Sequence, residues 1–146
     1  MHKKIKFVLF FFFVINIFNS SIGKENFFNK GVELYKNKKY DDARFMFERN
    51  IVFNPKDTKT KLYQAKIYNF EKDQKKEEKN LATALLIEPE NEEAILMTMK
   101  IALEKSNYTK VKVLSKTFTK VCKDLCEENK DILETLENLE PKNNES

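Results

Sequence analysis

The amino-acid sequence predicts an all-α protein, and three observations lead to that prediction. Large apolar residues recur with the period of a one-sided helix over most of residues 24–146. Two helix-stopping prolines, Pro55 and Pro89, stand 34 residues apart, each after such an apolar stripe. Residues 24–146 contain one glycine and two cysteines, so cohesion must come from the packing of apolar helix faces.

Residues 1–23 carry the parts of a secretory signal peptide in their usual order. A basic head precedes a nearly unbroken apolar run at 7–18, and the stretch after it is small and polar. Ser21 and Gly23 are the small residues of a cleavage site, which predicts a mature chain that begins at Lys24. The alternative is an uncleaved membrane anchor, but the apolar run gives only about 18 Å of helix against a hydrocarbon core of about 30 Å. We therefore expect an exported protein that is periplasmic, associated with a cell envelope or secreted.

The charge balance changes when this segment is set aside. Residues 1–23 hold three of the 27 lysines and arginines and none of the 23 aspartates and glutamates, so the remainder has a net charge of +1. A nucleic-acid-binding protein would keep a concentrated basic patch, whereas this remainder mixes its signs. We expect no nucleic-acid partner, and membrane contact only through an uncleaved N-terminal segment.

The remainder also lacks the usual reactive groups. His2 is the only histidine, and it lies in the predicted signal. Its removal excludes histidine-activated serine or cysteine nucleophiles and the usual histidine-containing zinc sites. Adjacent acids such as Asp41 and Asp42 diverge around a helix and do not face each other. We predict no catalytic residue, no cofactor and no metal site, and therefore a protein that is not an enzyme.

The stretch that ends near Pro55 is interpreted as one helix pair over residues 24–57. A first helix carries an apolar face up to Tyr35, a polar turn follows at 37–39, and a second helix begins at Tyr40. A second pair covers residues 58–91. The residues expected to pack the helices of these repeats together are Phe27, Gly31, Tyr40, Ala43, Phe47, Pro55, Ala65, Tyr68, Ala84 and Pro89.

This pattern resembles the tetratricopeptide repeat (TPR), a 34-residue helix pair with aromatic, small and alanine positions and a terminal proline. The resemblance implies a short right-handed α-α superhelix of three such pairs. The third pair, residues 92–125, is degenerate because Lys123 stands in the place of the proline, and Asn91 is its expected N-cap. Residues 126–140 continue the helical period and are the predicted capping helix, followed by a disordered tail at 141–146.

Three positions depart from the TPR pattern. Lys61 stands where a large aromatic is expected, and Asn50 and Glu77 stand where alanine is usual. The charged run at 71–80, which includes Glu77, is interpreted as a solvated turn followed by the outer start of a helix. The second repeat therefore depends on the period and on its neighbours for its assignment.

In TPR domains the first helix of each pair lines a concave groove that receives a peptide. The resemblance places on that surface Phe28, Asn29, Val32, Tyr35 and Lys36, then Leu62, Tyr63, Lys66, Asn69 and Phe70, and then Leu96, Met97, Lys100 and Leu103. For some of these aromatics the alternative is packing between repeats. Their apolar character predicts a protein or peptide partner with hydrophobic anchors, and the scattered lysines suggest acidic flanks.

These inferences together predict an exported, non-catalytic interaction module, a scaffold or assembly factor of a periplasm or cell envelope. The alternative is a membrane-tethered structural TPR protein held by an uncleaved N-terminal anchor. The two differ only in the fate of residues 1–23.

Cys122 and Cys126 leave two interpretations open. On a continuous helix the two cysteines share a face without good geometry for a disulfide, and reduced, partly buried thiols are the preferred interpretation. A helix break near Lys123 would instead let a disulfide join the third repeat to the cap. Export to an oxidising compartment favours this second interpretation.

Overall fold

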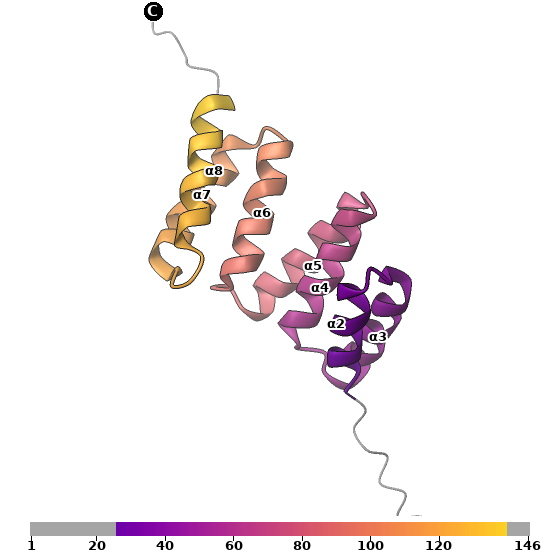
Figure 1. Ribbon diagram of the computed structural model, residues 1–146. Coiled ribbons are helices and arrows are strands. Elements are labelled where there is room, and N and C mark those ends of the chain that lie inside the picture. The colour runs from indigo at the N-terminus through magenta and orange to yellow at the C-terminus, as the bar shows by residue number, and fades with distance from the viewer. Residues whose placement is uncertain (1–25, 140–146) are drawn as a thin grey trace, which may run out of the picture.

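The computed structural model describes residues 26–139 (Figure 1). The predicted signal peptide or anchor at 1–23 and the predicted tail at 141–146 lie outside the described residues. Within 26–139 every regular element is an α-helix, which confirms the all-α fold class. The helices are α2 (Phe27–Lys36), α3 (Tyr40–Phe53), α4 (Thr58–Phe70), α5 (Gln74–Ile87), α6 (Glu92–Glu104), α7 (Tyr108–Val121) and α8 (Cys126–Leu139). No helix in this part of the chain is long and apolar enough to cross a membrane.

The helix bounds recur along the chain at the interval that separates Pro55 from Pro89. The second helices of the pairs begin at this interval, at Tyr40, Gln74 and Tyr108, and end at it, at Phe53, Ile87 and Val121. The first helices end at the same spacing, at Lys36, Phe70 and Glu104. The pairs follow one another along the molecule in chain order, from α2 and α3 at one end to α8 at the other (Figure 1).

The turn inside each pair has the same backbone geometry. Lys38, Lys72 and Ser106 stand at equivalent places in the three turns and have φ of 59°, 61° and 54°. In each turn this residue donates its amide to the carbonyl three residues back, and the next amide reaches five residues back. Such left-handed residues close the end of a helix, although a residue with a side chain adopts this conformation only infrequently.

The prolines end helices but do not pack them. Helices α3 and α5 each end two residues before their proline. Pro55 and Pro89 themselves are exposed, so their prediction as packing residues is wrong. A proline acts through its missing amide hydrogen and its restriction of the preceding residue, and neither effect requires burial. Asn91 is confirmed as the N-cap of α6, since its side chain accepts from the amide of Ala94 at 3.0 Å.

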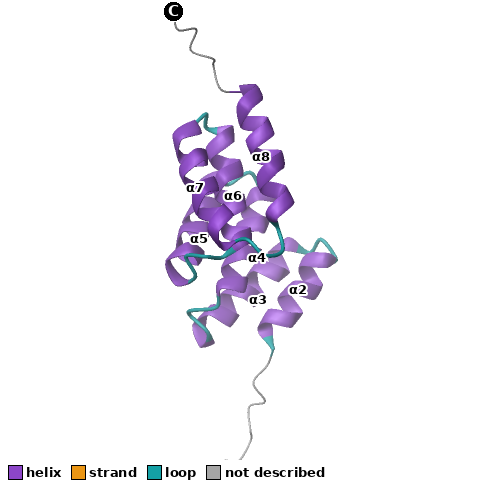
Figure 2. Cartoon of the chain, turned by 90° about the vertical axis from the view of Figure 1, so that its left-hand side faces the viewer, coloured by secondary structure: helices purple, strands orange, loops and turns teal. Residues whose placement is uncertain are grey.

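The hydrophobic core is a row of clusters along the stack. Ala43, Phe47 and Ile67 form the first. The second cluster contains Leu62, Ala65, Leu81, Ala84, Ala94 and Ile101. The third brings α8 onto α6 and α7 through Ile95, Leu96, Met99, Ala102, Val111, Phe118, Ile132 and Leu136. Figure 2 shows α8 lying beside α6, and this position continues the row of clusters to the end of the described chain.

Gly31 marks the closest approach of α2 and α3. A Cβ atom at this position would lie 2.6 Å from Cε1 of Phe47, whose side chain is fully buried. Nonbonded carbon atoms do not approach so closely, so a side chain at this position would force the buried ring or the helices to shift. The prediction that Gly31, Ala43 and Phe47 pack the first pair agrees with this geometry.

Two of the departures from the TPR pattern are buried and hydrogen-bonded. Asn50 is 5% exposed and donates to Asp57 at 2.6 Å and to Thr60 at 2.7 Å, which fastens α3 to the start of α4. Glu77 is 4% exposed and accepts from the amide nitrogen of Asn69 at 3.1 and 3.3 Å. Burial raises the pKa of Glu77, and the hydrogen bond from Asn69 opposes that rise. Glu77 is therefore an interior residue, and its interpretation as part of a solvated segment is wrong.

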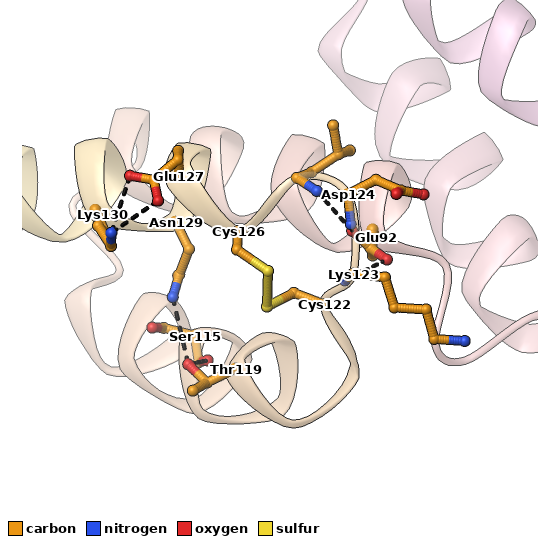
Figure 3. Close-up of a disulfide and its surroundings, with 11 residues drawn as sticks. Glu92, Ser115, Thr119, Cys122, Lys123, Asp124, Cys126, Glu127, Asn129 and Lys130 are labelled. Carbon is orange, nitrogen blue, oxygen red and sulfur yellow. Dashed lines mark hydrogen bonds and ion pairs between the residues drawn. A yellow bond between two sulfur atoms is a disulfide. The ribbon is translucent and has the colours of Figure 1, made fainter.

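The helical conformation is interrupted between α7 and α8. This interruption brings the two cysteines close enough to form a bond. Helix α7 ends at Val121, Cys122 is extended, and α8 begins at Cys126. The two residues form a disulfide with a Cα separation of 5.4 Å (Figure 3). The preferred prediction of reduced thiols is wrong, because it assumed a continuous helix.

Glu92, the first residue of α6, is bound by the turn that this disulfide closes. Its carboxylate accepts from the backbone amides of Lys123, Asp124 and Leu125 at 2.9, 3.1 and 2.9 Å (Figure 3). These donors lower the pKa of Glu92 because they stabilise its charged form. At the other end of α8, the hydroxyl of Tyr108 donates to the carbonyl of Leu139 at 3.1 Å. Helix α8 is thus tied to the third pair at both of its ends.

Candidate functional site

A depression of about 410 Å³ gathers several of the predicted groove residues. Tyr35 comes from α2, Lys66, Asn69 and Phe70 from α4, and Met97 from α6. Each of the three first helices therefore contributes, although these helices lie far apart in the chain. Two further residues complete the lining, Tyr40 at the start of α3 and Lys72 in the turn after α4.

A continuous series of aromatic rings leads from the core to this depression. Phe47 stacks on Tyr63 with centroids 5.3 Å apart, and Tyr63 meets Tyr35 edge to face at 5.2 Å. Tyr35 lies 5.5 Å from Tyr40, which in turn lies 4.3 Å from Phe70. Phe47 is fully buried whereas Phe70 is 62% exposed. The series therefore fixes an exposed aromatic surface on a rigid base, as aromatic contacts of this kind are each worth about 1 kcal/mol beyond burial.

The charged groups around these rings are unequally engaged. Lys66 forms an ion pair with Glu93 at 2.5 Å and lies 4.8 Å from the centre of the Tyr63 ring. Burial raises the pKa of Tyr35, and the nearby charge of Lys66 opposes that rise. The lining includes no aspartate or glutamate, and Lys72 forms no ion pair within the described residues.

The side-chain oxygen of Asn69 is available to a ligand. Its amide nitrogen donates to both oxygens of the buried Glu77 carboxylate, at 3.1 and 3.3 Å. An amide side chain offers two donor hydrogens and one acceptor oxygen, and here the donor end is directed at Glu77. The side-chain oxygen of Asn69 can therefore accept a hydrogen bond from a group that enters the depression.

The other predicted groove residues lie elsewhere. Leu62 and Leu96 are each 4% exposed, so their assignment to a binding surface is wrong. Each lies in a core cluster, because the neighbouring second helices or α8 cover that side of its helix. Lys100 and Leu103 line a separate depression of about 440 Å³ against α8, where Glu104, Glu128 and Asp131 surround them.

The first pair supplies both packing and surface residues. Phe28, Val32 and Tyr63 are partly buried against Ala43, Phe47 and Ile67, as the alternative of packing between repeats predicts for some aromatics. Asn29 and Lys36 are exposed on α2 and do not line the depression. The predicted groove residues that the structure brings together are thus Tyr35, Lys66, Asn69, Phe70 and Met97.

Two lining residues are not part of the site that the sequence predicts. Tyr40 is a predicted packing residue, and it packs on Tyr35 while also facing Phe70. Lys72 belongs to the run interpreted as a solvated turn. A signal for Lys72 exists in the sequence, since it stands 34 residues after Lys38 in the same turn, but only the structure shows that the turn borders the aromatic surface.

Depressions of about 800, 700, 540 and 440 Å³ also exist among the described residues, but each contains at most two of the predicted groove residues, whereas the aromatic depression contains five. One of about 800 Å³ lies beside the α3–α4 connection and is lined by Asn26, Phe28, Asn50, Phe53, Asn54, Pro55, Lys56 and Asp57. Its buried polar groups are hydrogen-bonded to one another, so they form a structural network.

No known protein family matches the chain, and no curated protein sequence matches it. The fold class and the geometry of the depression are therefore the basis for a functional proposal.

Proposed function

We propose that this protein is an exported, non-catalytic interaction module of the TPR type, which holds a segment of a partner protein through apolar anchors in the aromatic depression. The observation that carries the proposal is that residues of α2, α4 and α6 converge on one surface around the exposed ring of Phe70. An aromatic surface with a rigid base binds through desolvation, and methionine adapts to the shape of the anchor.

The recurrence of helix bounds supports the TPR assignment. Ends of both helices and the left-handed turn residues repeat at one interval in three successive pairs, including the pair without a proline. A 34-residue helix pair with a close contact between its helices is the unit of that family. Other families of helical repeats differ from this pattern in the length of the repeat or in the number of helices in each unit.

The role of a scaffold or assembly factor in a periplasm or cell envelope rests on residues 1–23. A disulfide between Cys122 and Cys126 agrees with export, because disulfides persist in oxidising compartments. Intact-mass measurement of the exported protein tests this part of the proposal. A mass equal to that of residues 24–146 supports a cleaved signal peptide. The mass of the full-length chain supports the membrane-tethered alternative.

The binding proposal is tested with purified protein and a phage-displayed peptide library. We expect selected peptides to share large apolar residues, and their binding to be lost in Phe70→Ala and in Met97→Ala. Leu86→Ala is the matched control, because Leu86 is 83% exposed on α5 and does not line the depression. Equal binding by the Phe70→Ala and Leu86→Ala proteins would refute the proposed surface, as would the absence of any selected peptide.

A further inference from the structure

Exposed lysines stand in two turns beside the aromatic depression. Tyr40 follows directly after the α2–α3 turn, Phe70 precedes the α4–α5 turn, and their rings lie 4.3 Å apart. The two turns are therefore neighbours at one edge of the depression. Their exposed lysines are Lys38, Lys39 and Lys72, which we call the lysine rim.

The acids in these turns form ion pairs with residues outside the lysine rim, and Lys72 interacts electrostatically with the buried Glu77 without forming an ion pair with it. Glu71 forms an ion pair with Arg44 at 2.5 Å, and Arg44 also holds Asp41 at 2.6 Å. Asp73 forms an ion pair with Lys76 at 2.8 Å and accepts from the Lys76 amide. None of the lysines of the rim forms an ion pair within residues 26–139.

The three lysines that the sequence pattern places in the groove offer no unpaired charge inside the depression. Lys66 is paired with Glu93, Lys100 lies among acids beside α8, and Lys36 is exposed but does not line the depression. A negative charge on a bound segment would therefore meet its unpaired complement only at the edge next to Phe70. The rim thus sets a direction along the depression, from the apolar centre to the positive edge.

We propose that the segment held in the depression is acidic on one side of its anchor, so that an aromatic or aliphatic side chain rests on Phe70 while adjacent carboxylates pair with the lysine rim. This inference rests on the proposed function and adds the charge and the orientation of the partner. Complementary charge across a binding surface acts mainly on association rate and specificity, and salt screens it over about 10 Å at 0.1 M ionic strength.

The rim offers a substitution that removes charge without a cost to folding. Lys38 and Lys72 have φ of 59° and 61°, a region that glycine adopts at no steric cost. Lys38→Gly and Lys72→Gly should therefore melt at or above the temperature of the parent. Any loss of binding in these variants then reports the missing charge and not a damaged fold. Ser106→Gly is the matched control, because it changes the equivalent turn of the third pair, away from the depression.

The experiment uses peptides with an apolar anchor followed by glutamates, and the same peptides with glutamine in place of glutamate. We expect the acidic peptides to bind more tightly, with a loss of about two- to fivefold for each lysine replaced, the range of an exposed ion pair. Lys72→Glu should weaken the preference more than Lys72→Gly does, Ser106→Gly should leave it unchanged, and the preference should weaken in high salt. Equal binding of both peptide sets, or insensitivity to Lys72→Glu, would overturn the inference.

The outcomes separate this inference from the proposed function. If both peptide sets bind equally and Phe70→Ala abolishes binding, the aromatic surface stands and the acidic partner is rejected. If neither set binds the parent protein, both proposals fail. Vesicles that contain phosphatidylserine provide the remaining arm, because lysines also attract anionic lipids. Vesicle binding that Lys72→Glu abolishes, without any preference for acidic peptides, would overturn the inference in favour of a membrane surface.

Discussion

The contact between Gly31 and Phe47 allows a quantitative test of the helix pairing. In Gly31→Ala the new methyl group would lie 2.6 Å from Cε1, 2.8 Å from Cδ1 and 3.0 Å from Cζ of the ring. The ring has little room to move, because it is fully buried and stacks on Tyr63 at 5.3 Å. Relief of the clash therefore requires a shift of α2 relative to α3.

Two opposing effects determine the size of the change. Overpacking a core costs about 1–3 kcal/mol, and alanine in place of glycine inside a helix gains about 1 kcal/mol. Because the facing atoms belong to an immobile ring, we take the upper half of the first range. Gly31→Ala should then lower the free energy of unfolding by about 1–2 kcal/mol, which corresponds to a fall in melting temperature of about 4–8 °C.

Urea denaturation followed by circular dichroism measures this change. Asn29→Ala is the control, because Asn29 is exposed on the same helix and the substitution changes helix propensity alone. Phe47→Leu should cost less stability in the Gly31→Ala background than in the parent, since it removes the atoms that clash. If Gly31→Ala were as stable as Asn29→Ala, or if the double-mutant cycle showed no coupling, the close approach of α2 and α3 would be refuted.

Three further predictions concern the disulfide and the two carboxylates with shifted pKa values. Replacing Cys122 and Cys126 together by serine should lower the free energy of unfolding by about 2 kcal/mol, the chain-entropy effect of so short a loop, and unchanged urea midpoints would contradict it. The lowered pKa of Glu92 means that its contribution to stability is complete above its unfolded pKa and is lost as pH falls through the folded value. Glu92→Gln should remove that part of the acid dependence, and a variant with the slope of the parent would show that the backbone donors do not act in this way. The raised pKa of Glu77 has the opposite sign, so its contribution is complete below the unfolded pKa and declines as pH rises through the folded value. Glu77→Gln, which still offers Asn69 an acceptor, should therefore be more stable than the parent at neutral pH, and thermal melts that show it to be less stable would rule out burial as the dominant effect.

Local signals account for the helix bounds that the sequence predicts. Proline, asparagine caps and the turn after each first helix act within a few residues, and they are legible without knowledge of neighbours in space. The third pair shows their limit. It ends at Val121 without a proline, at the interval set by the other pairs. In this pair no proline ends the second helix, and Val111 and Phe118 of that helix pack against α6 and α8.

The candidate site is predicted only in part, because periodicity assigns a residue to a helix face but does not say what covers that face. The resemblance places Leu62 and Leu96 on the same surface as Phe70 and Met97, yet neighbouring helices bury the first two. Lys66 lines the depression as predicted, but its ion pair with Glu93 depends on α6, the next helix but one along the chain. Such pairings are tertiary contacts, and they cannot be predicted from the helical periodicity of a single sequence.

The sequence by itself determined an all-helical chain and the regular spacing of its helix pairs, because short-range sterics and one-sided hydrophobicity decide these features. Only the tertiary structure decided which groove residues reach a common surface, which charges remain unpaired there, and that Cys122 and Cys126 are joined. These features depend on the distance between segments far apart in the chain, or on the interruption between α7 and α8. The packing of the helices determines that distance and the place of the interruption.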